Sequence, residues 1–351
     1  MSLQPRGDLA VLFQEIVDIE SVSGNERRLA DAVEAALAGL AHLHVVRDGE
    51  TLIARTELGR AERVVIAGHL DTVPVAGNLP SRWQDGVLHG RGTVDMKGGV
   101  AVMLQVAALA ELPAKDLTWI FYDHEEVAAT DNSLARIAAT RPDALAADFA
   151  VLMEPTSARV EGGCQGTLRF AITTTGRAAH SARSWLGHNA IHDAAGVLQR
   201  LSDYQPRAVE VDGLTYREGM NAVAISGGIA GNVVPDRCTV TVNFRFAPDR
   251  DQANAFAHCR EVFAGYELDF IDFAPGARPG LDKPIAGDFL AAVGGDALPK
   301  FGWTDVARFS ALGVPAVNYG PGDAGKAHAD DEACPLSDLV ACRDALLRWL
   351  G

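Results

Sequence analysis

Four short, continuously apolar runs restrict the folds open to this chain. They lie at residues 64–67, 117–122, 149–153 and 314–317. Runs of this length without polar alternation are typical of strands that are buried on both faces of a sheet. Stretches with a helical spacing of apolar residues separate or precede them, at residues 9–19, 29–40, 100–112 and 134–139. Strands that alternate with helices predict an α/β fold with a mixed, mostly parallel sheet sandwiched by helices.

The start of the second helical stretch carries its own signal, Ser23-x-x-Glu26. This is the spacing of a capping box, in which the serine and the glutamate each bond to a backbone N–H group at the start of a helix. We therefore expect Ser23 to cap this helix.

The middle of the chain follows a different order of elements. We expect strands at 167–175, 223–229, 239–246 and 267–273, and helices at 190–201 and 253–262. This β-α-β-β-α-β order is that of the ferredoxin-like unit. Gly162-Gly163 and Pro275-Gly276 flank it and are typical of hinges. The sequence therefore predicts one domain from residues 1–163 and 280–351, with a second domain, 164–279, inserted in it.

Composition restricts the classes of partner and the cellular compartment that fit this chain. With 31 basic and 46 acidic residues the net charge is −15, and such a surface repels nucleic acids and anionic membranes. Five cysteines without a Cys-x-x-Cys pair favour reduced thiols over disulfides or a thiolate zinc site. No apolar stretch fits a signal peptide or a membrane span. We expect a cytoplasmic protein with neither nucleic acid nor membrane as a partner.

Acidic and imidazole side chains follow each of the four apolar runs. They are His69 and Asp71 after the first, Glu125 and Glu126 after the second, Glu154 after the third and His328, by way of a loop, after the fourth. Ligands of open parallel sheets bind at the carboxyl ends of the strands, so these groups are expected to converge. Asp95, in the glycine-rich turn 90–99 before a helix, is a further candidate.

A cluster of imidazoles and carboxylates is unstable unless a cation neutralises it. Mixed nitrogen and oxygen donors suit Zn²⁺, with Co²⁺ or Mn²⁺ as substitutes, and a shared carboxylate suits two ions roughly 3.5–4 Å apart. Asp71 lies two residues from His69, where its carboxylate can take the other ring N–H group and fix the tautomer.

Each of these residues has an ordinary interpretation when taken alone. His69 is then a polar loop residue, Glu125-Glu126 a solvated pair and Asp95 a helix cap. Their occurrence after several separate strands favours the metal site. Competing motifs are incomplete: Gly90-x-Gly92 lacks the third glycine of a dinucleotide fingerprint, and neither a His-Glu-x-x-His zinc motif, a Gly-x-Ser-x-Gly elbow nor a P-loop occurs.

Together these motifs resemble those of the M20 family of metallohydrolases. Its marks are Gly-His-x-Asp, Gly-Arg-Gly-x-x-Asp-Met-Lys-Gly and Glu-Glu, found here at 68–71, 90–98 and 125–126. Glu154 and His328 stand at the expected later positions, and the match runs nearly from end to end. The resemblance implies a zinc-exopeptidase-like catalytic domain, with the inserted domain serving as lid and dimerisation domain.

The resemblance also implies a role for each candidate residue. Asp95 would bridge two zinc ions, one also held by His69 and Glu154 and the other by Glu126 and His328. Glu125 would take a proton from water and return it to the leaving amine. A cis peptide bond is implied after Asp95.

Further residues are assigned to the substrate. His180 resembles the residue that reaches the active site of a partner subunit and steadies the oxyanion. Asn243 and Arg245 share one strand face, where they either grip a substrate carboxylate or form a solvent-facing polar stripe. Thr304 and Arg308 match family positions near the substrate. Gln165 stands where family members carry Arg, which suggests that Arg183 contributes to recognition of the acyl group.

The resemblance thus implies a homodimeric amide hydrolase that acts on a small N-acyl amino acid. The expected reaction releases succinate from N-succinyl-LL-2,6-diaminopimelate, in lysine and cell-wall precursor synthesis. The alternative with the same chemistry is an N-acetylornithine deacetylase or another aminoacylase or peptidase of the family. A small-molecule binding protein without catalysis belongs to another class, and the spare acid Glu125 argues against it. A structural dimerisation module needs no convergent ligands.

Overall fold

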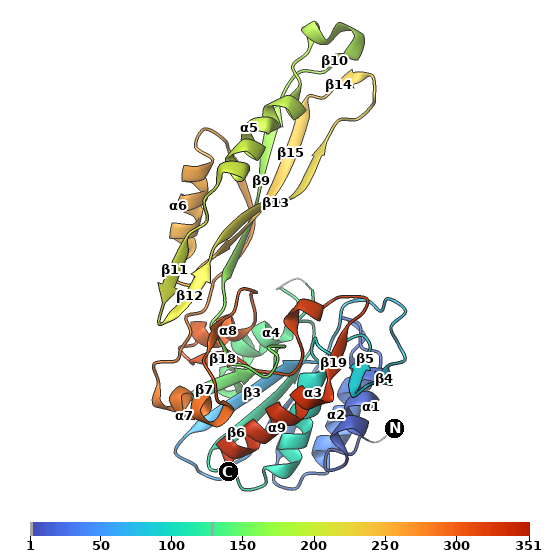
Figure 1. Ribbon diagram of the computed structural model, residues 1–351, viewed down its shortest axis with the longest axis vertical. Coiled ribbons are helices and arrows are strands. Elements are labelled where there is room, and N and C mark those ends of the chain that lie inside the picture. The colour runs from blue at the N-terminus through green and yellow to red at the C-terminus, as the bar shows by residue number, and fades with distance from the viewer. Residues whose placement is uncertain (1–2, 128–129) are drawn as a thin grey trace. The chain divides into compact units, whose positions relative to one another are not determined.

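A computed structural model describes residues 3–127 and 130–351, and in it the chain forms two compact units (Figure 1). The first unit comprises the chain up to Gly163 together with Pro279–Pro299 and Thr304–Gly351. The second comprises Cys164–Arg278 and the short segment Lys300–Trp303. No helix of the described residues has the length and apolar character needed to cross a membrane.

The first unit is built on an eight-stranded sheet of order β1-β2-β6-β3-β7-β18-β8-β17. Its strands are β1 (His44–Asp48), β2 (Thr51–Arg55), β3 (Arg63–His69), β6 (Asp116–Tyr122), β7 (Phe149–Leu152), β8 (Glu161–Gly162), β17 (Leu298–Pro299) and β18 (Ala316–Asn318). The four apolar runs of the sequence are the adjacent, mutually parallel strands β6, β3, β7 and β18. The expected α/β fold with a mixed, mostly parallel sheet is confirmed.

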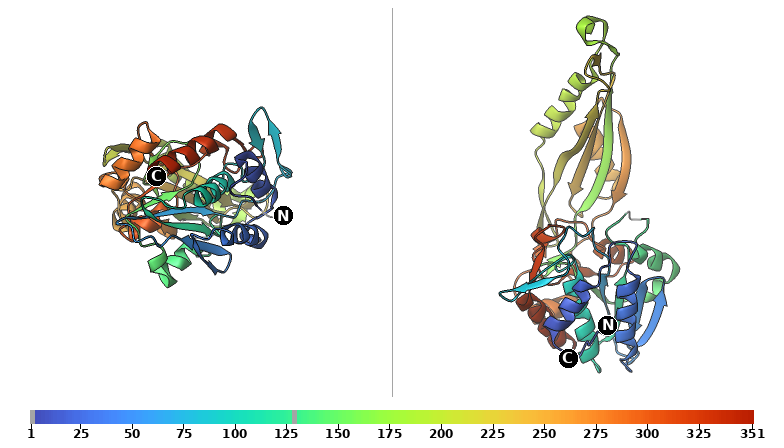
Figure 2. Two further views of the ribbon diagram at one scale, coloured as in Figure 1. Left: turned by 90° about the horizontal axis from the view of Figure 1, so that it is seen from below. Right: turned by 90° about the vertical axis from the view of Figure 1, so that its right-hand side faces the viewer.

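Helices cover both faces of this sheet (Figure 2). They are α1 (Leu9–Asp18), α2 (Arg27–Ala38), α3 (Lys97–Leu109), α4 (Ser133–Thr140), α7 (Pro284–Val293), α8 (Val306–Ala311) and α9 (Leu336–Leu350). Helices α1, α2, α3, α7 and α9 share one hydrophobic core with the sheet, and α4, which contacts α8, lies on the opposite face. A small sheet of β4 (Arg82–Gln84), β5 (Val87–His89) and β19 (Ala333–Pro335) completes the unit.

The capping-box prediction for α2 is wrong. This helix begins at Arg27 with Glu26 as its N-cap residue, and no side chain caps it. The Ser23 hydroxyl instead donates to the Asp71 carboxylate over 2.6 Å, and the Glu26 carboxylate accepts from the Gly24 N–H group. The tertiary contact with Asp71 therefore replaces the local cap.

The second unit has the β-α-β-β-α-β order expected from the sequence. Its main elements are β9 (Gly166–Thr175), α5 (Ala190–Asp203), β13 (Gly219–Gly227), β15 (Arg237–Phe246), α6 (Gln252–Val262) and β16 (Leu268–Ala274). The strands form an antiparallel sheet of order β13-β15-β9-β16, and α5 and α6 share one hydrophobic core with it. Two antiparallel pairs are not expected from the sequence: the hairpin of β11 (Ala208–Val211) and β12 (Leu214–Arg217), and the pairing of β10 (Ala179–His180) with the distant β14 (Val233–Val234).

The N-terminal turn of α3 packs against the end of β7 with no room for a side chain. A Cβ atom on Gly99 would lie 2.4 Å from the carbonyl oxygen of Met153 and 2.9 Å from its Cβ atom. This approach brings the loop that carries Asp95 next to the segment that carries Glu154. Glycine at position 99 is therefore needed for the packing of two ligand-bearing segments.

We expect Gly99→Ala to lower the free energy of unfolding by about 1–3 kcal/mol, because the added methyl group meets backbone atoms that cannot yield freely. Gly287 is the matched control, since it also lies inside a helix but a Cβ atom there meets nothing within 4 Å. Gly287→Ala is expected to raise stability by about 0.5–1 kcal/mol. Urea unfolding of the metal-stripped variants measures both, and similar shifts in the two variants would contradict the packing argument.

Candidate metal centre

The carboxyl ends of the parallel strands carry the candidate ligands. His69 is the last residue of β3, Glu126 follows β6, and Glu154 follows β7. Ligand atoms of His69, Asp95 and Glu126 all lie within 4.8 Å of one another. Glu154 is 6% exposed, and its charge acts on Glu125 and Tyr122. The convergence expected from the strand order is therefore present in the structure.

Asp95 lies at the centre of this group and turns one oxygen to each histidine. Its Oδ1 atom is 3.1 Å from Nε2 of His69, and its Oδ2 atom is 3.4 Å from Nε2 of His328. His328 Nε2 is also 2.8 Å from Oε1 of Glu126. The peptide bond from Asp95 to Met96 is cis, which confirms that implication of the resemblance. A carboxylate placed in this way can serve two cations at once.

The neighbouring carboxylates favour the positively charged form of both imidazoles. Hydrogen bonds to Asp95 and Glu126 raise the pKa of His328 to about 10. Burial lowers the pKa of His69, but the hydrogen bonds to Asp71 and Asp95 outweigh it and hold the pKa well above its usual value. Burial likewise raises the pKa of Asp95, and the hydrogen bonds from the two histidines outweigh it and leave this pKa well below its usual range. The cluster thus requires positive charge.

The mixed nitrogen and oxygen donors suit a divalent metal ion. Two imidazoles, one on each oxygen of a buried carboxylate, leave that carboxylate ionised and able to bind on both sides. A divalent cation would replace the imidazole protons, since histidine binds metal only in its neutral form. His69, Asp95, Glu126 and His328 therefore fit a metal centre.

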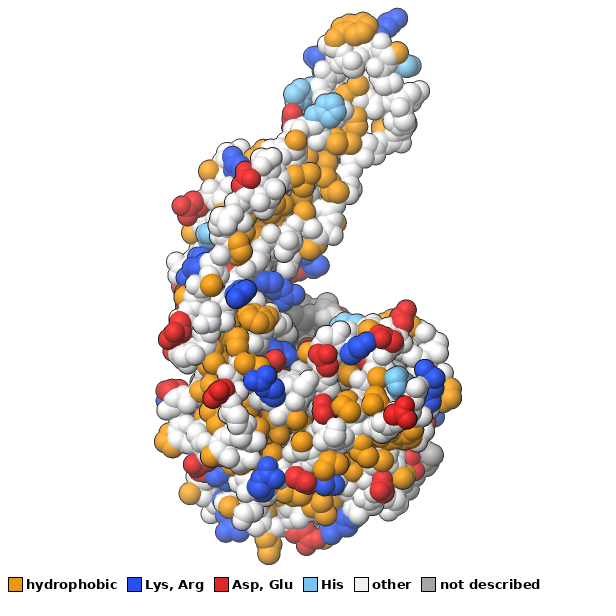
Figure 3. All heavy atoms as spheres, in the orientation of Figure 1, with side chains coloured by type: hydrophobic (Ala, Val, Ile, Leu, Met, Phe, Trp, Pro, Cys, Tyr) orange, Lys and Arg blue, Asp and Glu red, His pale blue; other side chains and the backbone are white. Residues whose placement is uncertain are grey.

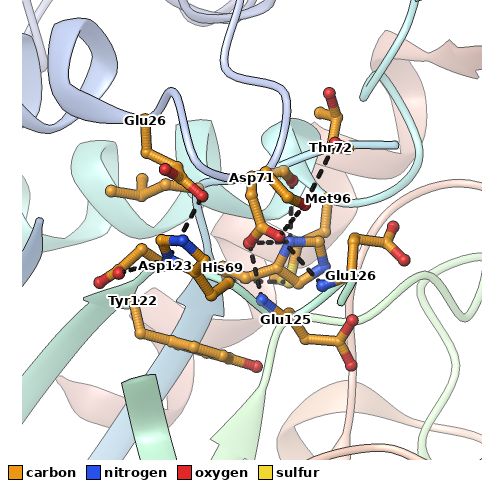
Figure 4. Close-up of polar contacts among 12 residues, drawn as sticks. Glu26, His69, Asp71, Thr72, Met96, Tyr122, Asp123, Glu125 and Glu126 are labelled. Carbon is orange, nitrogen blue, oxygen red and sulfur yellow. Dashed lines mark hydrogen bonds and ion pairs between the residues drawn. The ribbon is translucent and has the colours of Figure 1, made fainter. Parts of the chain in front are cut away.

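Asp71 organises the candidate ligand His69 and the Glu125-Glu126 pair (Figure 4). Its backbone carbonyl lies 2.9 Å from Nδ1 of His69, closer than its carboxylate at 3.5 Å. The carboxylate accepts the backbone N–H groups of Glu125 and Glu126, each over 3.0 Å, and the Ser23 hydroxyl. The expected contact to the ring is thus made mainly by the main chain, and the side chain holds the dipeptide.

Glu125 differs from the candidate ligand carboxylates in its electrostatic surroundings. Burial raises its pKa well above the usual value, and His69 opposes this shift. The charges of Asp305, Glu154 and Glu126 raise the pKa further. A carboxyl group whose pKa is raised in this way exchanges its proton nearer to neutral pH than an exposed one does.

A second polar network lies beside Glu125, and reasoning from the sequence missed its centre, Asp305. The Asp305 carboxylate accepts from the Tyr122 hydroxyl over 2.9 Å, from the Asn132 amide over 3.0 Å and from Arg308. Its neighbour Thr304 donates to the Asn318 amide oxygen over 2.8 Å. The signal in the sequence is an acidic residue directly before the helix α8, because a carboxylate buried at that position needs hydrogen-bond partners. Asp305 thus orients Arg308, one of the expected substrate residues.

The remaining candidates belong to the second unit. His180 is exposed, and its Nδ1 accepts from the backbone of Ala182. Arg183 is also exposed, within the 3₁₀ segment Ser181–Leu186. Asn243 donates to the Thr167 hydroxyl over 3.0 Å, and burial lowers the pKa of Arg245 on the same strand face.

Gln165 has a structural partner in this unit. It is almost fully buried, and its amide donates to the Arg217 carbonyl at the end of β12 over 2.6 Å. The side chain at this position therefore anchors the pair of strands β11 and β12.

Solved structures with low sequence identity share this fold over nearly the whole chain. A tripeptidase from Staphylococcus aureus superposes with a TM-score of 0.80 at 21% identity, covering 100% of this chain and 98% of that one. A Bacillus subtilis protein described as a dinuclear metal binding peptidase of the M20 family gives a TM-score of 0.72 at 16% identity, covering 97% and 96%. At these identities the likeness shows the fold.

Sequence comparisons show the family. A Mycobacterium tuberculosis protein, provisionally assigned as the succinyl-diaminopimelate desuccinylase DapE, is 53% identical over 99% of both chains. A succinyl-diaminopimelate desuccinylase from Corynebacterium glutamicum is 46% identical over 98% of this chain and 96% of its own. The family model for peptidase family M20/M25/M40 matches residues 65–351. This chain therefore belongs to peptidase family M20/M25/M40.

Proposed function

We propose that this chain is a dinuclear zinc enzyme that hydrolyses the amide of N-succinyl-LL-2,6-diaminopimelate to succinate and LL-2,6-diaminopimelate. Two near full-length relatives that are assigned this activity, at 53% and 46% identity, support the substrate. The observation that carries the chemistry is the Asp95 carboxylate, with one oxygen at each of two imidazoles. The alternative is deacylation of N-acetylornithine or another N-acyl amino acid by the same centre.

The proposed ligands divide into two sets that share Asp95. His69 and Glu154 would hold one zinc ion, and Glu126 and His328 the other. Bound zinc supplies a Lewis acid that polarises the amide carbonyl and makes water acidic at neutral pH. The donor set itself admits Co²⁺ and Mn²⁺ as substitutes.

Glu125 is the proposed acid and base. Asp71 binds only the backbone N–H group of Glu125, and His328 contacts the neighbouring Glu126. Neither of them anchors the Glu125 side chain. Burial raises its pKa, which places proton exchange nearer to neutral pH. Its carboxylate would therefore take a proton from the attacking water and return it to the leaving amine.

The substrate carries several carboxylates, and we propose that cationic and polar side chains hold them. Arg308 is oriented by the buried Asp305, and Thr304 is fixed on Asn318. In the second unit Arg183, Asn243 and Arg245 are the proposed contacts. A guanidinium group binds a carboxylate through paired hydrogen bonds, so these arginines suit an acidic substrate better than a neutral one.

We also propose a homodimer that forms through the edge strand β13. Among the described strands β13 pairs only with β15, and residues 221–227 are exposed. Figure 3 displays hydrophobic groups along this unit. The exposed apolar side chains of β13 and α5 include Ile191, Leu198, Val223 and Ile225. An apolar strand edge of this kind is a template for pairing with a second chain. In the dimer, His180 would serve the partner's reacting carbonyl.

The substrate prediction is tested with zinc-loaded protein. We expect hydrolysis of N-succinyl-LL-2,6-diaminopimelate with a kcat/KM above that for N-acetylornithine, and loss of activity when a chelator removes the metal. Succinate release and amine formation measure the two reactions. A preference for the acetylated substrate would overturn the proposed specificity.

Glu125→Gln separates an enzyme from a binding protein in the same assay. Turnover should fall by about 10²–10⁴-fold because the amide cannot carry the proton. Zinc content should stay unchanged, because Glu125 is not a proposed ligand. Unchanged turnover would refute its role.

Asp71→Asn is expected to lower kcat by about 10–100-fold at full zinc occupancy. The Asp71 carboxylate accepts three hydrogen bonds, from two backbone N–H groups and the Ser23 hydroxyl. An amide has only one oxygen, so it cannot accept on both sides as the carboxylate does. Ser23→Ala, which removes only the hydroxyl donor, is the control and should cost less than about tenfold. Steady-state kinetics with zinc analysis measure both, and equal effects would contradict the role of Asp71 in holding the Glu125-Glu126 backbone.

The dimer is tested with two isoleucines on opposite edges of one sheet. Ile225 on β13 is 53% exposed, and Ile271 on β16 is 51% exposed. Ile225→Lys should yield monomers, because a charge would be buried at the strand pair, whereas Ile271→Lys should leave the dimer intact. Sedimentation velocity measures the state. A wild-type monomer, or a dimer that persists in Ile225→Lys, would refute the proposed interface.

A further inference from the structure

A buried carboxylate that is not among the proposed ligands supports the loop of Asp95. Glu332 is 1% exposed. Its Oε1 atom accepts the backbone N–H groups of Val94 and Asp95 over 2.9 and 3.1 Å. Its Oε2 atom accepts from the Gly92 N–H group over 3.0 Å and from Arg91 Nη1 over 2.9 Å. Both oxygens are thus occupied by donors from the turn that presents Asp95.

Arg91 extends this contact to two other segments. Its Nη1 also donates to the Ala329 carbonyl over 3.2 Å, and its Nε donates to the Pro74 carbonyl over 3.1 Å. Ala329 directly follows His328, and Glu332 lies four residues after His328. The Arg91–Glu332 pair therefore joins the segment of His328 to the loop of Asp95.

The two halves of the centre differ in what holds them. His69 ends strand β3, and its ring is fixed by the backbone carbonyl of Asp71. His328 lies outside the strands, in a loop after a short 3₁₀ turn, and its φ angle is +65°. Its position relative to Asp95 thus depends on contacts such as the Arg91–Glu332 pair rather than on a strand.

We propose that Glu332 is a positioning residue for the ion bound by Glu126, His328 and the shared Asp95. It acts little on the ion bound by His69, Glu154 and the same Asp95, because His69 ends strand β3 and Glu154 follows strand β7. The proposal rests on the dinuclear centre of the proposed function. Glu332→Gln removes the negative charge from a buried site. Its amide N–H₂ group would face the N–H donors of the Asp95 turn and could not accept hydrogen bonds from them. The Asp95 turn then loses its hold on the segment of His328. Loss of such an outer partner typically weakens metal affinity on the order of 10–100-fold.

The test is metal binding by metal-stripped protein, followed without an activity assay. Co²⁺ is titrated into the wild type and Glu332→Gln, and visible absorption and calorimetry report each equivalent. We expect two steps in the wild type. In the variant we expect a first step with unchanged affinity and spectrum, and a second step that is about 10–100-fold weaker with an altered spectrum.

Asp116→Asn is the matched control. Asp116 is also a buried carboxylate that accepts two backbone N–H groups, from Leu58 and Arg60, but it lies at the opposite end of β6 from Glu125. Both cobalt steps should be unchanged in this variant. Weakening of the second step in Asp116→Asn to the same extent would mean a general loss of stability and would overturn the proposal.

The remaining outcomes separate the two claims. A wild type that binds fewer than two ions would refute the dinuclear centre itself. A wild type with two steps and a Glu332→Gln variant with the same two affinities would refute only the role of Glu332. If Glu332→Gln does not fold, Arg91→Gln tests the same contact from the other side. It should weaken the second step alone, and an unchanged second step there would refute the proposal.

Discussion

Repulsion among buried carboxylates is the constraint on which the rest of this structure depends. Asp95, Glu125, Glu126 and Glu154 converge at one edge of a sheet, where low polarity strengthens their mutual repulsion. The chain offsets this repulsion with two imidazoles and with backbone N–H groups aimed at carboxylates such as Asp71. The parallel strands fix where these charges meet, and the surrounding loops decide how each is used.

Much of this arrangement could be predicted from the sequence, because its causes are local. The apolar runs of β3, β6, β7 and β18 are continuous, and parallel strands deliver the residues after them to one edge. The start of α2 could not be predicted in the same way. Ser23 has the local spacing of a cap, but its hydroxyl donates a hydrogen bond to a carboxylate 48 residues away. The tertiary contact with Asp71 therefore replaces the helix cap that the local motif predicts.

Supporting residues are harder to find in a sequence than ligands. Asp305 is hydrogen-bonded to Tyr122, which lies 183 positions away in the sequence. Glu332 is hydrogen-bonded to Arg91, which lies 241 positions away. Nothing in the local spacing marks such pairs, because the fold alone brings them together. Asp71 shows the same limit on a smaller scale, since its backbone carbonyl contacts the imidazole more closely than its carboxylate does.

The two N–H groups that bind Asp71 belong to neighbouring residues, Glu125 and Glu126. One anchor therefore sets the register of a dipeptide whose two side chains differ: the Glu126 carboxylate contacts His328, and the Glu125 carboxyl group, whose pKa burial raises, is the proposed acid and base. Inserting or deleting a single residue in this turn would exchange the positions of the proposed ligand and the proposed acid. The chemistry proposed for the centre therefore depends on the position of each glutamate relative to the anchored backbone as much as on the residue type.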